Sequence, residues 1–130
     1  MRIVIPFALL LAALLATQRA VAHEDDADRP GAAARAQLGK VHFANSCAAA
    51  VTRDFDTSVA LLHSFWVKDA IEGFNHVLKS DPHCAIAYWG IAMSLQQNPL
   101  TGQPPNADAT RLALAGMEKA KAIGAKTQRE

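Results

Sequence analysis

The chain has 130 residues, which is enough for one small domain, and 51% of them are hydrophobic. Its 13 basic and 12 acidic side chains leave a formal net charge of only +1. This balance excludes the strongly basic class of nucleic-acid-binding proteins, so we expect no nucleic-acid partner.

Residues 1–22 have the pattern of a secretory signal peptide. Arg2 precedes an apolar run from Ile3 to Ala16, and Ala20-Val21-Ala22 then fits a cleavage site. The run is shorter than the about 20 residues that a membrane-spanning helix needs, and an uncleaved anchor is the alternative. We therefore expect a periplasmic or secreted chain that begins at His23 and has no membrane contact after cleavage.

Residues 23–44 are expected to form a flexible or irregular segment. It opens with the acidic stretch His23-Glu24-Asp25-Asp26 and continues with proline and alanine. An N-terminal His23 can chelate copper, but its mobile acidic surroundings favour an ordinary tail. Val41 and Phe43 are apolar, and we expect them to lie against the first helix.

Four helices are predicted within residues 45–124, at about 48–64, 67–79, 82–97 and 107–123. No sustained alternation of β-branched and polar residues indicates a strand, so the predicted fold class is all-α. Asn45 or Ser46 is the expected cap of the first helix, and Asp81 with Pro82 is the expected start of the third. Gly124 is a natural stop for the fourth helix.

Side-chain patterns predict which faces of these helices are buried. The second helix should bury Ala70, Ile71, Phe74, Val77 and Leu78, and the fourth should bury Leu112, Ala113, Leu114, Met117 and Ala120. Phe65 and Trp66, in the turn between the first two helices, should also be largely buried. Four acidic residues are interpreted as a solvated face, namely Asp54, Asp56, Asp69 and Glu72.

The pattern of the first helix recurs after 34 residues. Phe55, Ser58, Val59 and Leu61 precede Trp89, Ala92, Met93 and Leu95 by that interval. The stripe of Ala70, Phe74 and Val77 recurs 43 residues later, at Ala113, Met117 and Ala120. The excess of nine residues falls in the loop from Gln96 to Asn106, which is rich in proline. A 34-residue period of paired helices is typical of tetratricopeptide repeats.

The chain from about Val41 to Gly124 resembles tetratricopeptide repeat proteins. The matching positions are Ser58, Leu61, Ala70, Phe74, Pro82, Tyr88, Ile91, Ala92, Leu95, Ala113, Met117 and Ala120. Asp54 and Thr57 depart from the large residues expected where the first unit starts. Leu61–Trp66 and Cys84–Ala92 also resemble a group of larger exported bacterial repeat proteins. The resemblance implies two antiparallel helix pairs stacked as a short tetratricopeptide-like superhelix over 45–124, with residues 125–130 as a tail.

Cys47 and Cys84 are the only cysteines, and export would place them in an oxidising compartment. In the repeat geometry they lie near the starts of equivalent helices that stack side by side. They are three residues out of the 34-residue register, so a disulfide forms only if the chain before the first helix leans toward the third. Val41 and Phe43 are suited to draw it there, and two separate thiols are the alternative.

Metal and catalytic sites have weaker support in the sequence. Neither His42 with Cys47 nor His83 with Cys84 has a metal-binding spacing, and a Cys–His nucleophile would lack an orienting acid. We therefore expect no enzyme, no metal and no cofactor. The aromatic residues Phe65, Trp66, Tyr88 and Trp89 are interpreted as core and turn packing in preference to a ligand site.

Three functions remain open. The first is an exported repeat module that binds a protein or peptide on the concave side, which the first helices of the units line. The second is the N-terminal fragment of a larger array without independent activity, because such arrays usually need three or more units. The third is a periplasmic protein that handles metal or redox chemistry through Cys47 and Cys84. Two units alone also make self-association possible.

Overall fold

The computed structural model describes residues 36–96, 99–124 and 126–130. The predicted signal peptide and the chain up to residue 35 lie outside these residues. The helices are α3 (Thr52–His63), α4 (Val67–Ser80), α5 (Ala85–Leu95) and α6 (Ala107–Ile123), with short 3-10 turns η2 (Ala49–Val51) and η3 (Pro99–Thr101). The described part of the chain contains no strand, which confirms the all-α class.

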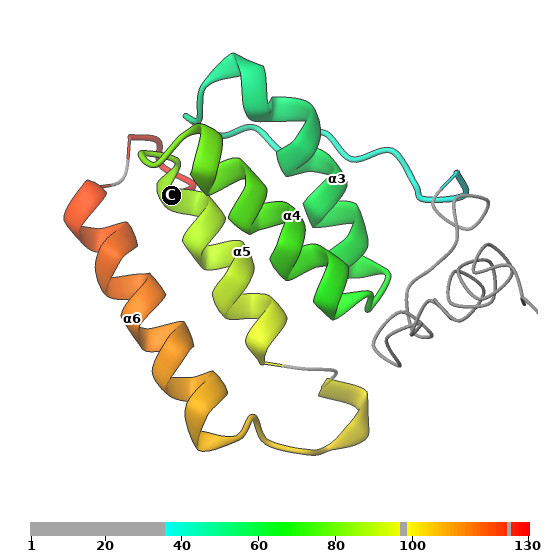
Figure 1. Ribbon diagram of the computed structural model, residues 1–130. Helices are drawn as coiled ribbons and strands as arrows, with labels where there is room; N and C mark the ends of the chain where they lie inside the picture. Colours follow the sequence, from blue (N-terminus) through cyan, green and yellow to red (C-terminus); the bar gives the residue numbers. More distant parts are fainter. Residues whose placement is uncertain (1–35, 97–98, 125) are drawn as a thin grey trace, which may run out of the picture.

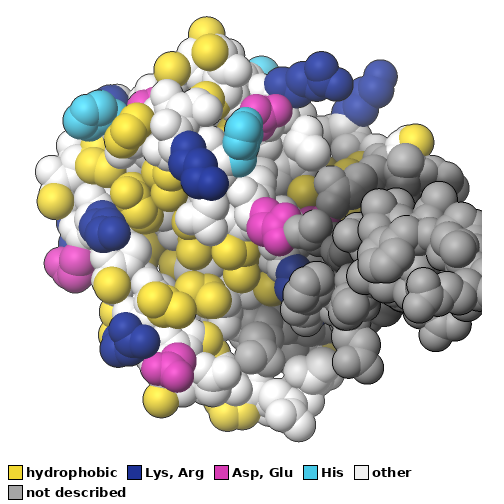
Figure 2. All heavy atoms as spheres, viewed as in Figure 1, with side chains coloured by type: hydrophobic (Ala, Val, Ile, Leu, Met, Phe, Trp, Pro, Cys, Tyr) yellow, Lys and Arg dark blue, Asp and Glu magenta, His cyan; other side chains and the backbone are white. Residues whose placement is uncertain are grey.

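Successive helices are neighbours in space and alternate in direction (Figure 1). α3 packs against α4, α4 against α5 and α5 against α6, while α5 also touches α3. The chain therefore forms two antiparallel helix pairs, α3/α4 and α5/α6, that pack side by side. On the face in Figure 2, Lys and Arg side chains are interspersed with Asp and Glu around apolar side chains.

The core lies where α5 packs against the first helix pair. Phe74 of α4 is fully buried and meets Phe55 of α3 edge-on, with 5.5 Å between the ring centroids. Gly90 of α5 lies directly against the Phe74 ring, because a Cβ atom at this position would overlap that ring. The missing side chain lets α5 approach α4 closely. The buried cluster is Val51, Phe55, Val59, Leu61, Ala70, Phe74, Val77, Cys84, Ile86 and Ala87.

The segment before α3 packs against α3, as predicted, and also against α5. The Phe43 ring stacks on Trp89 of α5, with 5.8 Å between the ring centroids, and packs against Phe55 of α3, with 5.7 Å between the centroids. The backbone N–H of Phe43 also donates to the Asp56 carboxylate at 3.0 Å. Asp56 therefore belongs to a packed contact, and its predicted place on a solvated face is wrong.

The predicted start of the third helix is wrong. Asp81 ends α4, and its carboxylate accepts hydrogen bonds from the N–H groups of Ala48 at 2.7 Å and His83 at 3.1 Å. Pro82 is exposed in the turn that follows, and α5 begins only at Ala85. Asp81 thus fastens the start of the first helix to the α4–α5 turn instead of capping α5.

The predicted caps of the first helix are also wrong. The Asn45 side chain accepts from the Cys47 N–H and donates to the Phe43 carbonyl, so it stabilises the approach to the helix. The Ser46 hydroxyl donates to Glu130. α6 ends as predicted, because Gly124 has a positive φ of 87°. Its start is capped by Asn106, whose side chain accepts from the Ala109 N–H at 2.8 Å.

Several burial predictions are wrong because the burial of a side chain depends on which other elements pack against its own. α6 packs mainly against α5, and Leu112 and Leu114 are 51% and 63% exposed. Phe65 is half-exposed, whereas Trp66 is partly buried. Asp69 is 5% exposed and does not lie on a solvated face.

The proposed repeat positions differ in burial. The buried ones are Ser58, Leu61, Ala70, Phe74, Ala92 and Ala113. The partly buried ones are Tyr88, Ile91, Leu95, Met117 and Ala120. Pro82 is exposed, so it marks a turn and not the core. The second pair thus buries its repeat positions less completely than the first pair.

Candidate functional site

Three apolar side chains follow one side of α5 at helical spacing. Ile86, Trp89 and Met93 are separated by three and four positions, and we call them the Trp89 strip. Ile86 is buried, Trp89 is partly buried and Met93 is 43% exposed. The strip belongs to the first helix of the second pair, the kind of helix expected from the sequence to line the binding side.

A hollow lies at the Met93 end of the Trp89 strip. It has a volume of about 410 Å³ and is lined by Leu62, His63, Phe65, Val67, Trp89, Met93 and Gln96. We call it the Phe65 hollow. Its lining comes from the end of α3, the start of α4 and one side of α5, so it lies between the two helix pairs.

Phe65 has an unusual backbone conformation beside this hollow. Its φ is +59°, the left-handed region that costs energy for a residue with a Cβ atom. The turn is held by hydrogen bonds from the Phe65 N–H to Leu62 and from the Trp66 N–H to Leu61. Such strain persists only where surrounding structure fixes it. The turn leaves an aromatic side chain half-exposed at the rim, which sequence reasoning missed.

A second hollow lies at the Ile86 end of the Trp89 strip, between α5, α6 and both ends of the described chain. It has a volume of about 490 Å³ and is lined by Phe43, Ala85, Ile86, Trp89, Met117, Ala120, Lys121, Arg129 and Glu130. We call it the Met117 hollow. Trp89 lines both hollows, so one aromatic side chain separates and joins the Phe65 hollow and the Met117 hollow.

Residues 126–130 form one border of the Met117 hollow. The Arg129 guanidinium lies over the Phe43 ring at 4.9 Å. Glu130 accepts hydrogen bonds from the Ser46 N–H at 2.9 Å and from the Ser46 hydroxyl at 2.8 Å. Burial raises the pKa of Glu130, but hydrogen bonds from Ser46 and from the Lys126 and Thr127 amides outweigh it and lower the pKa below its ordinary value.

Glu130→Gln is expected to lower the thermal midpoint at pH 7 but hardly at pH 3. A carboxyl group whose pKa is lowered by folding stabilises the protein above its unfolded pKa, about 4.3. That contribution is lost as the pH falls through the lower folded pKa. Thermal unfolding at both pH values, with Glu118→Gln as an exposed control, measures the difference. An equal effect of Glu130→Gln at both pH values would contradict the hydrogen-bonded carboxylate.

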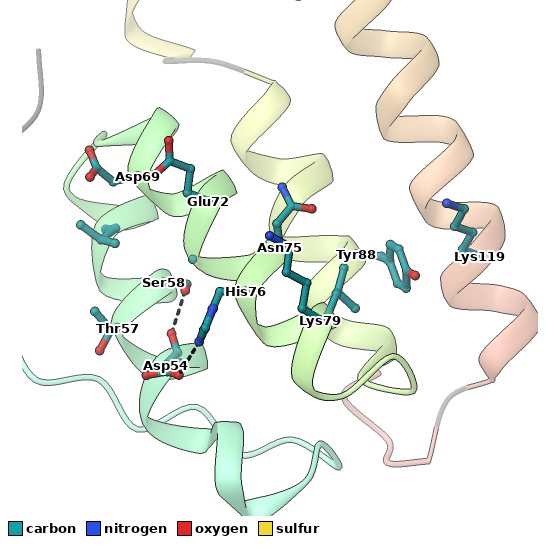
Figure 3. A pocket seen from close by; sticks show the side chains of 13 residues that line it. Asp54, Thr57, Ser58, Asp69, Glu72, Asn75, His76, Lys79, Tyr88 and Lys119 are labelled. Carbon is teal, nitrogen blue, oxygen red and sulfur yellow. Dashed lines mark hydrogen bonds and ion pairs between the residues drawn. The ribbon is translucent and has the colours of Figure 1, made fainter. Parts of the chain in front are cut away.

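A separate polar groove crosses α4 (Figure 3). Its volume is about 900 Å³, and its lining includes Asp54, Ser58, Asp69, Glu72, His76, Lys79, Tyr88 and Lys119. The His76 imidazole lies 3.6 Å from the Asp54 carboxylate, and Lys119 lies over the Tyr88 ring at 5.9 Å. The groove therefore carries charges of both signs.

The groove gathers a serine, a histidine and an aspartate, but their geometry does not form a nucleophile. The Ser58 hydroxyl donates to the backbone carbonyl of Asp54 at 2.7 Å, and Ser58 is 1% exposed. A Cβ atom at Gly73 would overlap this hydroxyl, so α4 closes over it. A general base must reach its proton, and this proton is committed to the helix backbone.

Cys47 and Cys84 are joined, with their Cα atoms 4.6 Å apart. The predicted closeness of the two cysteines is therefore confirmed, and the chain before η2 does lean toward α5. Asp81 lies beside them, and these three residues form the one group of potential metal ligands found in the described part of the chain. Neither His42 nor His83 belongs to it. Sulfur atoms in a disulfide are not thiolates, which are the form that binds metals.

Among the described residues, no helix is both long and apolar enough to cross a membrane. Comparisons of the chain with protein-family models, with curated proteins and with solved structures gave no match.

Proposed function

We propose that this chain is a helical-repeat module that binds a protein or peptide through the Trp89 strip, and that it is not an enzyme. The observation that carries the proposal is that Trp89 lines two neighbouring hollows whose linings are largely apolar. Concave surfaces lined by apolar and aromatic side chains are the usual form of binding sites. A half-exposed Phe65 in a strained turn adds a large apolar contact at one of these hollows.

The proposal includes a relationship to tetratricopeptide repeats. The 34-residue period and the side-by-side packing of two antiparallel pairs support this relationship. The proposal also includes export, with cleavage before His23. The charged and apolar start of the sequence and the joined cysteine pair support it, because disulfides persist in oxidising compartments. The module needs no metal and no cofactor for this function.

Selection from a library of random peptides displayed on phage tests the proposed function. The mature chain from His23 is expected to enrich peptides that lose binding to a Phe65→Ser/Met93→Lys variant. Both side chains are exposed enough to be changed without opening the core. Leu112→Lys, a comparable change outside both hollows, is expected to leave binding unchanged. No enrichment, or enriched peptides that bind the strip variant equally well, would contradict the proposal.

A further inference from the structure

The second helix pair exposes positions whose repeat equivalents are buried in the first pair. Phe55 and Val59 of α3 are at most 1% exposed, but their equivalents Trp89 and Met93 of α5 are partly buried and 43% exposed. Phe74 and Val77 of α4 are fully buried, but their equivalents Met117 and Ala120 of α6 are only partly buried. The difference arises because α5 covers the first pair, while no described helix covers the second.

The Met117 hollow lies on the second pair at the place that corresponds to the surface of the first pair under α5. Its lining contains Trp89, Met117 and Ala120, the equivalents of Phe55, Phe74 and Val77. In the first pair these three residues belong to the buried core, and Gly90 of α5 lies against the ring of one of them, Phe74. The surface that accepts α5 on the first pair is therefore present again on the second pair, as an open hollow.

We infer that the Trp89 strip binds an α-helix of a partner protein, which packs on α5 and α6 as α5 packs on α3 and α4. This inference rests on the proposed docking function and names its ligand class. The continuity with the α4/α5 interface favours a helix over an extended peptide, because the same side-chain pattern already accepts a helix within the chain.

The α4/α5 interface also indicates the sequence of the partner helix. Gly90 lets α5 lie against Phe74, so a small residue is expected where the partner helix crosses Trp89 and Met117. Apolar residues are expected one turn away on either side, toward the two hollows. Lys121, Arg129 and Glu130 border the Met117 hollow, so charges of both signs lie at that end and a polar residue of the partner helix is expected there.

A synthetic peptide with the sequence of residues 82–96 is the appropriate probe, because α5 already fits the equivalent surface. Fluorescein-labelled peptide, with added terminal glutamates for solubility, is titrated with the mature chain and followed by anisotropy and circular dichroism. The peptide is expected to bind and to become helical. A version with leucine at the position of Gly90 and a scrambled version are each expected to bind about tenfold more weakly or worse. Met93→Lys in the protein is expected to weaken binding similarly, and Leu112→Lys is not.

The other outcomes separate this inference from the proposed function. Equal binding of the scrambled peptide would overturn the inference that the ligand is a helix, and it would leave the proposed docking function in place. Binding that is insensitive to Met93→Lys would show that the peptide does not bind at the Trp89 strip. Self-association of the chain that Met93→Lys abolishes would identify a second copy, and not a partner helix, as the occupant. No binding by this peptide, together with no enrichment from the phage library, would overturn both proposals.

Discussion

Replacing Phe74 with alanine is expected to lower the free energy of unfolding by about 3–5 kcal/mol, the usual cost of removing a buried phenylalanine. Phe74 is 0% exposed and lies under Gly90 of α5, and its ring centroid is 5.5 Å from that of Phe55. One ring therefore contacts both helices of the first pair and the first helix of the second. Its loss leaves a cavity at the junction of α3, α4 and α5, which a domain of this size has little stability to offset.

Chemical denaturation of the mature chain measures this effect. Lys79→Ala is the matched control, because Lys79 lies on the same helix and is exposed. The control is expected to stay within about 0.5 kcal/mol of the parent chain. A Phe74→Ala midpoint no lower than that of Lys79→Ala would refute the placement of Phe74 at the centre of the core.

Opening the Cys47–Cys84 bridge is expected to lower the free energy of unfolding by about 3–4 kcal/mol in the chain-entropy model. The bridge closes a loop with a sequence separation of 37. Cys84 is fully buried at the start of α5, and Asp81 binds the Ala48 N–H beside the bridge. Reduction therefore removes the covalent link between the approach to the first helix and the start of α5.

Non-reducing peptide mapping of the exported protein is expected to find one linked Cys47–Cys84 peptide. Added reductant is expected to lower the thermal midpoint of this protein and to leave the midpoint of a Cys47→Ala/Cys84→Ala variant unchanged. The recovery of two alkylatable thiols from protein purified out of an oxidising compartment would reject the bridge as a stabilising element.

Local patterns in the sequence predicted most of the fold. These patterns depend on residues within one helix or between equivalent helices. They are the Phe74 stripe, the 34-residue period and the stop at Gly124. The helix predicted at about 107–123 has these boundaries in the structure, since it follows the predicted loop and ends before Gly124. The closeness of Cys47 and Cys84 also followed from the packing of equivalent helices.

The sequence could not predict the features that depend on distant parts of the chain. Asp81 has the position of a helix cap, but its carboxylate is taken by Ala48, 33 residues away. Glu130 binds Ser46 across 84 residues. The exposure of Phe65 follows from a positive φ that non-glycine residues seldom adopt, so no residue type signals it. Phe65 and Glu130 each line one of the two hollows, which is why the candidate site was only partly predictable.

Site-specific photo-crosslinking shows whether the Trp89 strip is the docking surface. A benzoyl-phenylalanine is placed at position 93 in the strip or at position 112 on α6, outside both hollows. Each protein is irradiated with the phage-selected peptides and the 82–96 peptide. A crosslinked product is expected from position 93, and little is expected from position 112. Equal crosslinking from both positions, or crosslinking from position 112 alone, would contradict docking at the Trp89 strip.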